Sequence, residues 1–307
     1  MRAPSSLSDS RGVVGDIRRF LLKAEALPTP KGTALKLMEM AQDPQAAIEA
    51  ILRVVQSDPA LTGFVLRTAS SAAFHGRNEG LDLRRSVLRL GLDAIRSHAL
   101  MLSMVHQQIR TVCPGFDYPG FWLASLHTAI LMQMLSKRRP ALQISDCFTI
   151  GLLGEVGRLA FATAAPEEYG RLLAELHRDG GELAVLERDR FGFDHHELSA
   201  VLLADWGIPT TLAEVAYYQA DPEGGSFASD SLQHHLAGAL QLATCLSRLT
   251  LSQASESDHD AAMLRAAILD LPSDAMHEIL AASIPELRDW ARLVGLPAPQ
   301  THPLPLH

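Results

Sequence analysis

The fold is decided by residues 43–72, DPQAAIEAILRVVQSDPALTGFVLRTASSA. Asp43-Pro44 and Asp58-Pro59 are helix start signals, because Asp accepts a backbone N–H at an N-cap and Pro needs no donor in the first turn. Between them, apolar residues recur at the spacing of one helix face: Ile48, Ile51, Leu52 and Val55. The stretch therefore predicts short amphipathic helices in tandem.

The same helical periodicity dominates the rest of the chain, while alternating β-branched runs are few. This pattern predicts an all-α fold. In the second half we expect helices at about 122–137, 145–163, 166–177, 181–191, 195–206, 210–218 and 232–249, followed by shorter helices to about 294. Gly91 lies inside a further predicted helix that opens at Ser86, where it indicates a break or a close packing point.

A change of composition divides the chain at Thr111–Gly120, which holds two prolines and two glycines. We expect one domain over 19–250 made of two packed helical lobes, an N-terminal lobe at 19–110 and a second lobe at 120–250. Residues 1–18 are predicted to be a flexible segment, 259–295 a C-terminal helical appendage and 296–307 a tail.

Size and charge narrow the classes of function. The 307 residues are 47% hydrophobic, enough for a large core, and the formal net charge of -8 argues against nucleic-acid binding. The three cysteines form no CxxC pair, which favours reduced, buried thiols. No signal peptide or membrane span is apparent, so we expect a cytoplasmic protein without a membrane partner.

Several separate motifs occur in order along the chain. In the first half they are Leu27-Pro28, Asp58-Pro59-Ala60-Leu61, residues 66–74 (LRTASSAAF) and residues 86–92 (SVLRLGL). In the second half they are Phe121-Trp122, Gly151-Leu152-Leu153, Gly157-Arg158-Leu159, residues 191–195 (FGFDH) and residues 206–209 (WGIP). Together these motifs resemble the HDOD family, a bacterial signalling domain related to the HD superfamily of metal-dependent phosphohydrolases. Ser70 departs from the pattern, since the family usually has Asn there.

The resemblance implies an all-helical fold of two lobes and a role in bacterial regulation. It also implies signalling proteins as partners, from two-component or cyclic-dinucleotide machinery, and leaves room for a small nucleotide ligand. No cofactor is expected.

The resemblance also locates the metal ligands of an HD-type site, and this chain has lost most of them. Ala124 stands where the first His would be, and Gly154-Glu155 where the His-Asp pair would be. Gln219-Ala220 replaces a frequent His-His pair, so only His195 matches. Ala and Gly cannot bind a metal, and we therefore expect no catalytic residue, no metal and no enzyme activity.

An alternative is a rebuilt site that would make the protein a metal-dependent phosphohydrolase of a nucleotide or cyclic dinucleotide. Its candidate ligands are Glu155, His195, His196, His127 and Asp146. The other interpretation is that His127 and His195 are hydrogen-bonded core or boundary histidines and that His196 is more exposed.

Four residues are candidate contacts for a ligand or partner: Trp122, Arg158, His195 and Trp206. Either indole could stack on a base, although a core position is the usual one for Trp. The Arg158 guanidinium could bind a phosphate, or could instead pair with Glu155 or Glu187. The leading hypothesis is a non-catalytic regulatory module that acts by binding.

Overall fold

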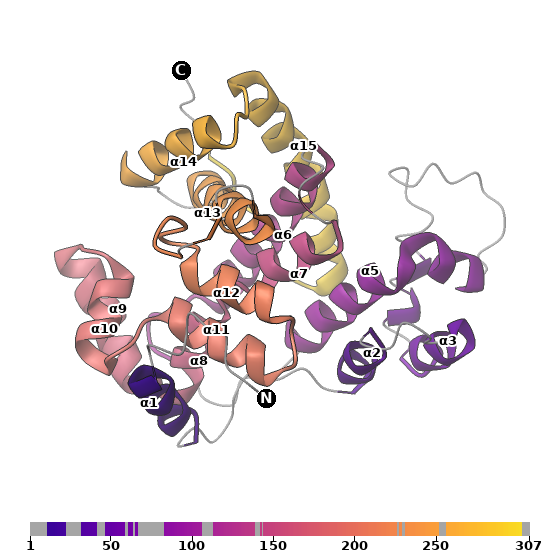
Figure 1. Cartoon of the computed structure of the whole chain (residues 1–307), viewed down its shortest axis with the longest axis horizontal. Helices are drawn as coiled ribbons and strands as arrows, with labels where there is room; N and C mark the ends of the chain where they lie inside the picture. The colour runs from indigo at the N-terminus through magenta and orange to yellow at the C-terminus, as the bar shows by residue number, and fades with distance from the viewer. Residues whose placement is uncertain are drawn as a thin grey trace. The chain divides into compact units, whose positions relative to one another are not determined.

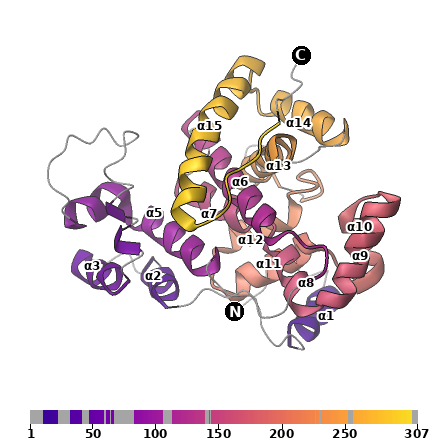
Figure 2. The ribbon, with the colours of Figure 1, turned by 180° about the vertical axis from the view of Figure 1, so that it is seen from behind.

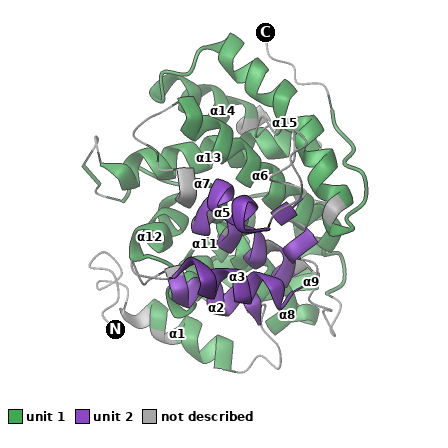
Figure 3. Cartoon of the chain, turned by 90° about the vertical axis from the view of Figure 1, so that its right-hand side faces the viewer, with its two compact units in different colours: residues 1–28, 109–307 green, residues 29–108 purple. Residues whose placement is uncertain are grey.

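The structure, a computed structural model, describes residues 11–22, 32–41, 47–58, 61–63, 65–66, 83–105, 113–138, 142, 144–225, 227–228, 231–251 and 256–302. Every regular element in these ranges is an α-helix (Figure 1), which confirms the predicted all-α fold. The chain forms two compact units, one of residues 29–108 and one that combines residues 1–28 with 109–307 (Figure 3). We call them the small unit and the large unit.

The small unit contains α2 (Thr33–Ala41), α3 (Ile48–Gln56) and α5 (Leu83–Val105), and α5 packs against the other two. Asp58 starts a helical turn as predicted, because its carboxylate accepts the Leu61 N–H at 3.1 Å and the Thr33 hydroxyl at 2.8 Å. The predicted break at Gly91 is present as a kink in α5 with φ +80°. The other start signal, Asp43-Pro44, and the motif at 67–74 lie outside the described residues.

The large unit holds the remaining helices. They are α1 (Arg11–Leu22), α6 (Tyr118–Arg138), α7 (Ile144–Leu153), α8 (Val156–Ala164), α9 (Pro166–Asp179), α10 (Leu183–Phe191), α11 (His195–Asp205), α12 (Thr210–Tyr218), α13 (Leu232–Leu251), α14 (Glu256–Ile268) and α15 (Ser273–Val294). At its centre, α6 contacts α7, α13 and α15, which surround it in Figures 1 and 2. Because α6 is covered on several sides, its buried residues lie around the whole helix rather than along one face.

The single helix predicted at about 145–163 is wrong, since a turn at Gly154-Glu155 separates α7 from α8. Backbone bonds close the turn on both sides, from Gly154 N–H to Ile150 O at 2.8 Å and from Arg158 N–H to Glu155 O at 3.0 Å. Apolar residues continue on both sides of this turn, so periodicity alone did not mark it. The turn places Glu155 at the start of α8, inside the large unit.

The N-terminal segment also differs from expectation, because residues 11–18 belong to a helix and not to a flexible segment. Ile17 and Leu21 of α1 are buried. Phe20 meets the rings of Phe161 and Phe193 edge-on, each at 5.5 Å between centroids. Aromatic packing therefore holds α1 in the large unit, although residues 19–28 had been assigned to the N-terminal lobe.

The C-terminal helices are part of the large unit and not an appendage to it. α14 packs on α13, α15 packs on α6, and the rings of Phe148 and Trp290 lie 5.6 Å apart. The tail also returns to the unit, since the His302 N–H bonds the Thr250 carbonyl at 2.9 Å. The predicted boundary near residue 250 therefore does not separate two bodies.

One segment, Cys147–Ala164, is apolar enough over its length to pass as a membrane span, and 78% of it is buried within the protein. It includes the turn between α7 and α8, and its residues form part of the core. The three cysteines are buried and carry reduced thiols, as predicted.

We predict that Phe20→Ala lowers the free energy of unfolding by about 2 kcal/mol, because it removes a partly buried ring from an aromatic cluster. Urea unfolding measures the change. Leu22→Ala on the same helix is the control: Leu22 is 85% exposed, so its loss should cost less than about 0.5 kcal/mol. Equal stabilities of the two variants would show that α1 does not pack as described.

Candidate functional site

The positions at which the family resemblance leads us to expect metal ligands converge in space. Ala124 comes from α6, Gly154 and Glu155 from the turn before α8, and Gln219 from the end of α12. All four line one small cavity of about 30 Å³. Residues almost a hundred positions apart therefore form one site, as the resemblance implies.

Glu155 is the charged centre of this site and is bound by two arginines. Its Oε2 lies 3.0 Å from Arg158 Nη1, and its Oε1 lies 2.6 Å from Arg248 Nη2. Burial alone would raise the pKa of Glu155, but Arg248 and Arg158 outweigh it and hold that pKa well below its usual range. The same carboxylate raises the pKa of Arg158 against the effect of burial. Glu155 is therefore a fixed anion whose charge two guanidinium groups already balance.

Gln219 closes the side of the cavity where the family often has histidine. Its Nε2 donates to Gly154 O at 2.8 Å and Ala216 O at 3.2 Å, and also contacts His196 Nδ1 at 2.8 Å. Two carbonyl acceptors fix which end of the amide is the nitrogen. Gln219 therefore crosslinks the turn, α12 and α11.

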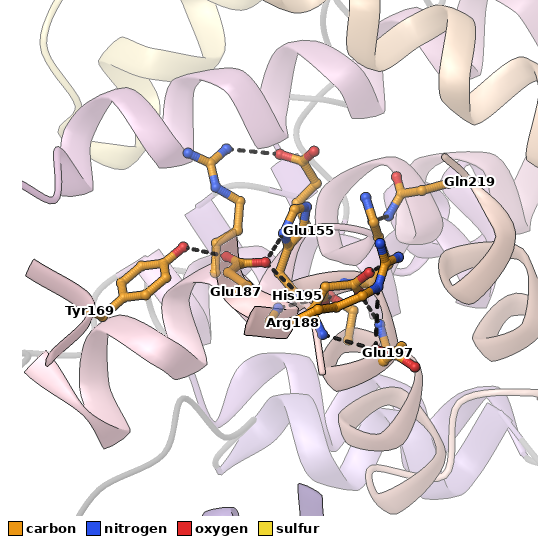
Figure 4. Close-up of polar contacts among 12 residues, drawn as sticks. Glu155, Tyr169, Glu187, Arg188, His195, Glu197 and Gln219 are labelled. Atoms are coloured by element: carbon orange, nitrogen blue, oxygen red, sulfur yellow. Dashed lines mark hydrogen bonds and ion pairs between the residues drawn. The ribbon is translucent and has the colours of Figure 1, made fainter. Parts of the chain in front are cut away.

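His195 is held by a buried acid. Glu187 Oε2 accepts the His195 backbone N–H at 2.8 Å and lies 2.5 Å from His195 Nδ1. The other oxygen of Glu187 accepts the Tyr169 hydroxyl at 2.8 Å, so the three side chains form a row in Figure 4. In the tautomer that directs Nδ1–H at this carboxylate, the lone pair of the ring lies on Nε2. That nitrogen is buried and has no hydrogen-bond partner.

A capping box fixes the start of α11 and with it the direction of His195. The Asp194 carboxylate accepts the backbone N–H groups of His196 at 2.8 Å and Glu197 at 2.9 Å. Glu197 in turn accepts the Asp194 N–H at 2.9 Å, and Arg188 forms an ion pair with Asp194. This signature was present in the FGFDHHE sequence, where Asp is followed three residues later by Glu.

His196 is the more exposed of these histidines, as predicted, but it is still buried, with 7% of its surface exposed against 3% for His195 and 0% for His127. Its ring packs 3.9 Å from the His195 ring, between centroids, and binds Gln219. Burial lowers the pKa of His196 well below its usual range, and His195 contributes in the same direction. His196 is therefore neutral.

A larger cavity of about 420 Å³ adjoins the small one and shares Glu155, Arg158, Gln219, Thr244 and Arg248 with it. It extends along α13 to Gln241 and reaches the loop before α10 and Ala261 of α14. His195 and His196 lie on its wall. The site thus includes the C-terminal helices as well as the region that carries the family motifs.

The other predicted site residues lie elsewhere. His127 is fully buried with its Nε2 2.9 Å from Ser283 Oγ, which confirms the interpretation of a hydrogen-bonded core histidine. Trp122 is buried against Phe121, Trp206 ends α11, and neither lines these two cavities. The side chain of Asp146 lies outside the described residues.

Sequence reasoning missed Arg248, Thr244 and Gln241. They are separated from Glu155 by about ninety residues and lie beyond the motifs, so no local spacing pointed to them. Glu187 was considered only as a partner of Arg158, whereas it binds His195 and Tyr169.

The donor set does not fit the HD-type metal. Ala124 and Gly154 offer no ligand atom, and the charge of Glu155 is balanced by two arginines. The amide N–H groups of Gln219 already bond protein atoms. Within the described part of the chain, no three His, Cys, Asp or Glu side chains are grouped to share an ion. We derive no step through a metal.

Comparison with known proteins gives three findings. A family model described as the HDOD domain matches residues 27–222. The structure of an HDOD domain protein with unknown function from Geobacter sulfurreducens has a TM-score of 0.68, with 20% identity over 91% of this chain and 99% of that one. The MmoQ response regulator of Methylococcus capsulatus strain Bath is 32% identical over 83% of this chain and 98% of its own, with a TM-score of 0.49.

A curated protein of Treponema pallidum (strain Nichols), described as uncharacterized, is 22% identical over 188 residues. The match covers 61% of this chain and 36% of that protein, so this chain corresponds to about a third of the curated relative.

We predict that the protein loses stability as the pH falls below about 6.5. Burial lowers the pKa of His127 to about 3 and that of His196 well below its usual range. In the unfolded chain both groups take up protons below about pH 6.5, so the unfolded state then binds more protons than the folded state. Below about pH 6.5, each histidine should lower the free energy of unfolding by about 1 kcal/mol per pH unit. Above about pH 6.5 the contribution of the neutral histidines to stability is fully present.

Urea unfolding between pH 7.5 and 4.5 measures this slope. His127→Gln should flatten it, since the amide can still reach Ser283 but does not titrate. His277→Gln is the control, because His277 is exposed. An unchanged slope in His127→Gln would contradict the assignment.

We further predict that Gly154→Ala destabilises the protein by about 2 kcal/mol. A Cβ atom at residue 154 would lie 2.9 Å from Ile150 O and 3.2 Å from Leu240 Cδ2. Gly238→Ala in α13 is the matched control, since its Cβ would meet only Leu269 Cδ2, at 3.8 Å. There the helix preference for Ala should leave stability unchanged or raised by up to about 1 kcal/mol, and thermal unfolding compares the two.

Proposed function

This chain belongs to the HDOD family, and from that membership we propose that it is a non-catalytic signal-transduction module that acts by binding other proteins. The family comprises signalling proteins and proteins like the HD phosphohydrolases. Of these two roles, the residues of the site favour the first.

The observation that carries the proposal is the pairing of Glu155 with Arg158 and Arg248. In an HD-type site, imidazole and carboxylate groups hold divalent cations that activate water. Here the cations next to the retained carboxylate are side chains of the protein. A guanidinium group neutralises an acid, but it keeps its protons and cannot generate hydroxide at neutral pH.

Restoring the missing ligands would also meet a steric barrier. A side chain at residue 154 would have to displace the Ile150 carbonyl and the Leu240 side chain. Because protein interiors are close-packed, such a change shifts backbone as well as side chains. The packing around the turn is thus adapted to the absence of a ligand at this position.

A module of this kind transmits a signal through a change in the relative populations of its conformations. A partner that prefers one arrangement of the helices stabilises it, and other surfaces of the protein then change with it. The Glu155 ion pairs link the turn before α8 to both α8 and α13, so a rearrangement of this turn would shift both helices. The partners we propose are cytoplasmic signalling proteins, such as components of a two-component system.

We predict that the purified protein holds well below one Mn, Fe or Zn ion per chain after incubation with each metal and desalting, as measured by elemental analysis. It should also hydrolyse bis(p-nitrophenyl) phosphate no faster than His195→Ala does, because the ligand set is incomplete. One or two ions per chain, lost together with hydrolysis in His195→Ala, would show instead that the chain is a phosphohydrolase.

A further inference from the structure

Unsatisfied polar atoms gather around the larger cavity. Four buried side-chain atoms of its lining residues have no hydrogen-bond partner: Arg158 Nε, His195 Nε2, Gln219 Oε1 and Thr244 Oγ1. Buried polar atoms without partners are rare, and a group of them around a polar cavity indicates that something else satisfies them. Water can do so in the free protein, and a ligand can replace that water.

Two of these atoms are hydrogen-bond acceptors. Gln219 Oε1 is an oxygen because the other end of the amide donates to the carbonyls of Gly154 and Ala216. His195 Nε2 accepts a hydrogen bond in the tautomer that directs its Nδ1–H at Glu187. His195 is 3% exposed and lies between Glu187 and Glu155 in Figure 4. The ligand therefore needs N–H or O–H donors.

The opposite requirement comes from the arginines. Arg158 and Arg248 face one buried carboxylate, that of Glu155, while the other acidic residue of the lining, Glu182, is exposed. Arg158 Nε–H still requires an acceptor, and a guanidinium group matches the oxygens of a phosphate.

Part of the lining is apolar, and it bears on the character of the ligand. This part consists of Leu176, Leu183, Ala184, Ala220, Cys245 and Ala261. The volume of about 420 Å³ lies within the range of small-ligand pockets and suits a molecule of mononucleotide size. The ligand thus combines an anionic group, N–H or O–H donors and an apolar body.

We propose that this cavity binds a nucleoside monophosphate without hydrolysing it, with the phosphate at Arg158 and Arg248 and the donor groups at Gln219 and His195. Thr244 Oγ1 can both donate and accept a hydrogen bond, so it can bind either the phosphate or the donor groups of the nucleotide. This inference rests on the proposed function, because a bound and unchanged ligand acts as a signal rather than a substrate. The ligand would set the position of α13 relative to α8 through the Glu155 ion pairs.

Isothermal titration calorimetry with AMP, GMP, CMP and UMP tests the proposal on the full chain. We expect at least one of them to bind in a 1:1 ratio with a Kd below about 0.1 mM. The matching nucleoside and inorganic phosphate should each bind at least about tenfold more weakly, because each makes only part of the contacts.

Two variants test the location. Thr244→Val removes a hydroxyl that has no partner in the protein, so it should weaken binding about tenfold without lowering stability. Arg248→Met should weaken binding about thirtyfold, since it removes a charged donor.

Each variant has a matched control. Thr250→Val changes another residue of α13, whose hydroxyl already bonds Leu246 O. Arg138→Met changes an arginine with a 2.6 Å ion pair to Glu278 and 42% side-chain exposure, against 2.6 Å and 41% for Arg248. Both controls should bind the nucleotide as the unaltered protein does.

The outcomes separate this inference from the proposed function. Both the ligand site and the proposed function are supported if the nucleotide binds, the variants weaken binding as expected, and the nucleotide is recovered intact. Chromatography of the recovered ligand shows whether it is intact. The ligand site is overturned if none of the four nucleotides binds, or if Thr244→Val and Arg248→Met bind the nucleotide as tightly as the unaltered protein does. Either result leaves the proposed function unaffected. Release of nucleoside and phosphate would support the site and overturn the proposed lack of catalysis.

Discussion

The structure around the site depends on a single constraint, which is that the carboxylate of Glu155 is buried and must be neutralised. An unpaired buried charge costs several kcal/mol, and a metal or a cationic side chain can remove that cost. In this chain Arg158 comes from one turn further along α8, and Arg248 comes from α13. The loss of metal ligands at Ala124 and Gly154 and the presence of two guanidinium groups are thus linked by the charge of one residue.

His195 illustrates how a residue of a metal site can remain for another reason. Its ring and its backbone N–H both bind Glu187, and the capping box of Asp194 and Glu197 fixes the helix that carries it. Removing the imidazole would leave Glu187 buried without one of its partners, which is costly even where no metal is bound. A matching histidine is therefore poor evidence for catalysis unless its neighbours are also examined.

Much of the fold could be predicted from local sequence, and the limits have physical causes. The helix at 210–218 and the cap at Asp58 follow from short-range spacing and hydrogen bonding. The turn at Gly154-Glu155 was missed because apolar residues continue on both sides of it. The helix α1 was missed because it is held by contacts of Phe20 with rings that are distant in the sequence. For the site, Ala124, Gly154, Glu155 and Gln219 could be named from the sequence and do line one cavity, whereas Arg248 and Thr244 required knowledge of how α13 packs.

The position of α13 has a consequence for how proteins of this kind diversify. The family model ends at residue 222, but Gln241, Thr244, Cys245 and Arg248 all come later in the chain. The recognisable domain and the unit that encloses the cavity thus have different boundaries, and α13 is shared by the core and the cavity wall. Substitutions along one face of this helix can change the shape and charge of the cavity wall while every motif that identifies the family stays the same.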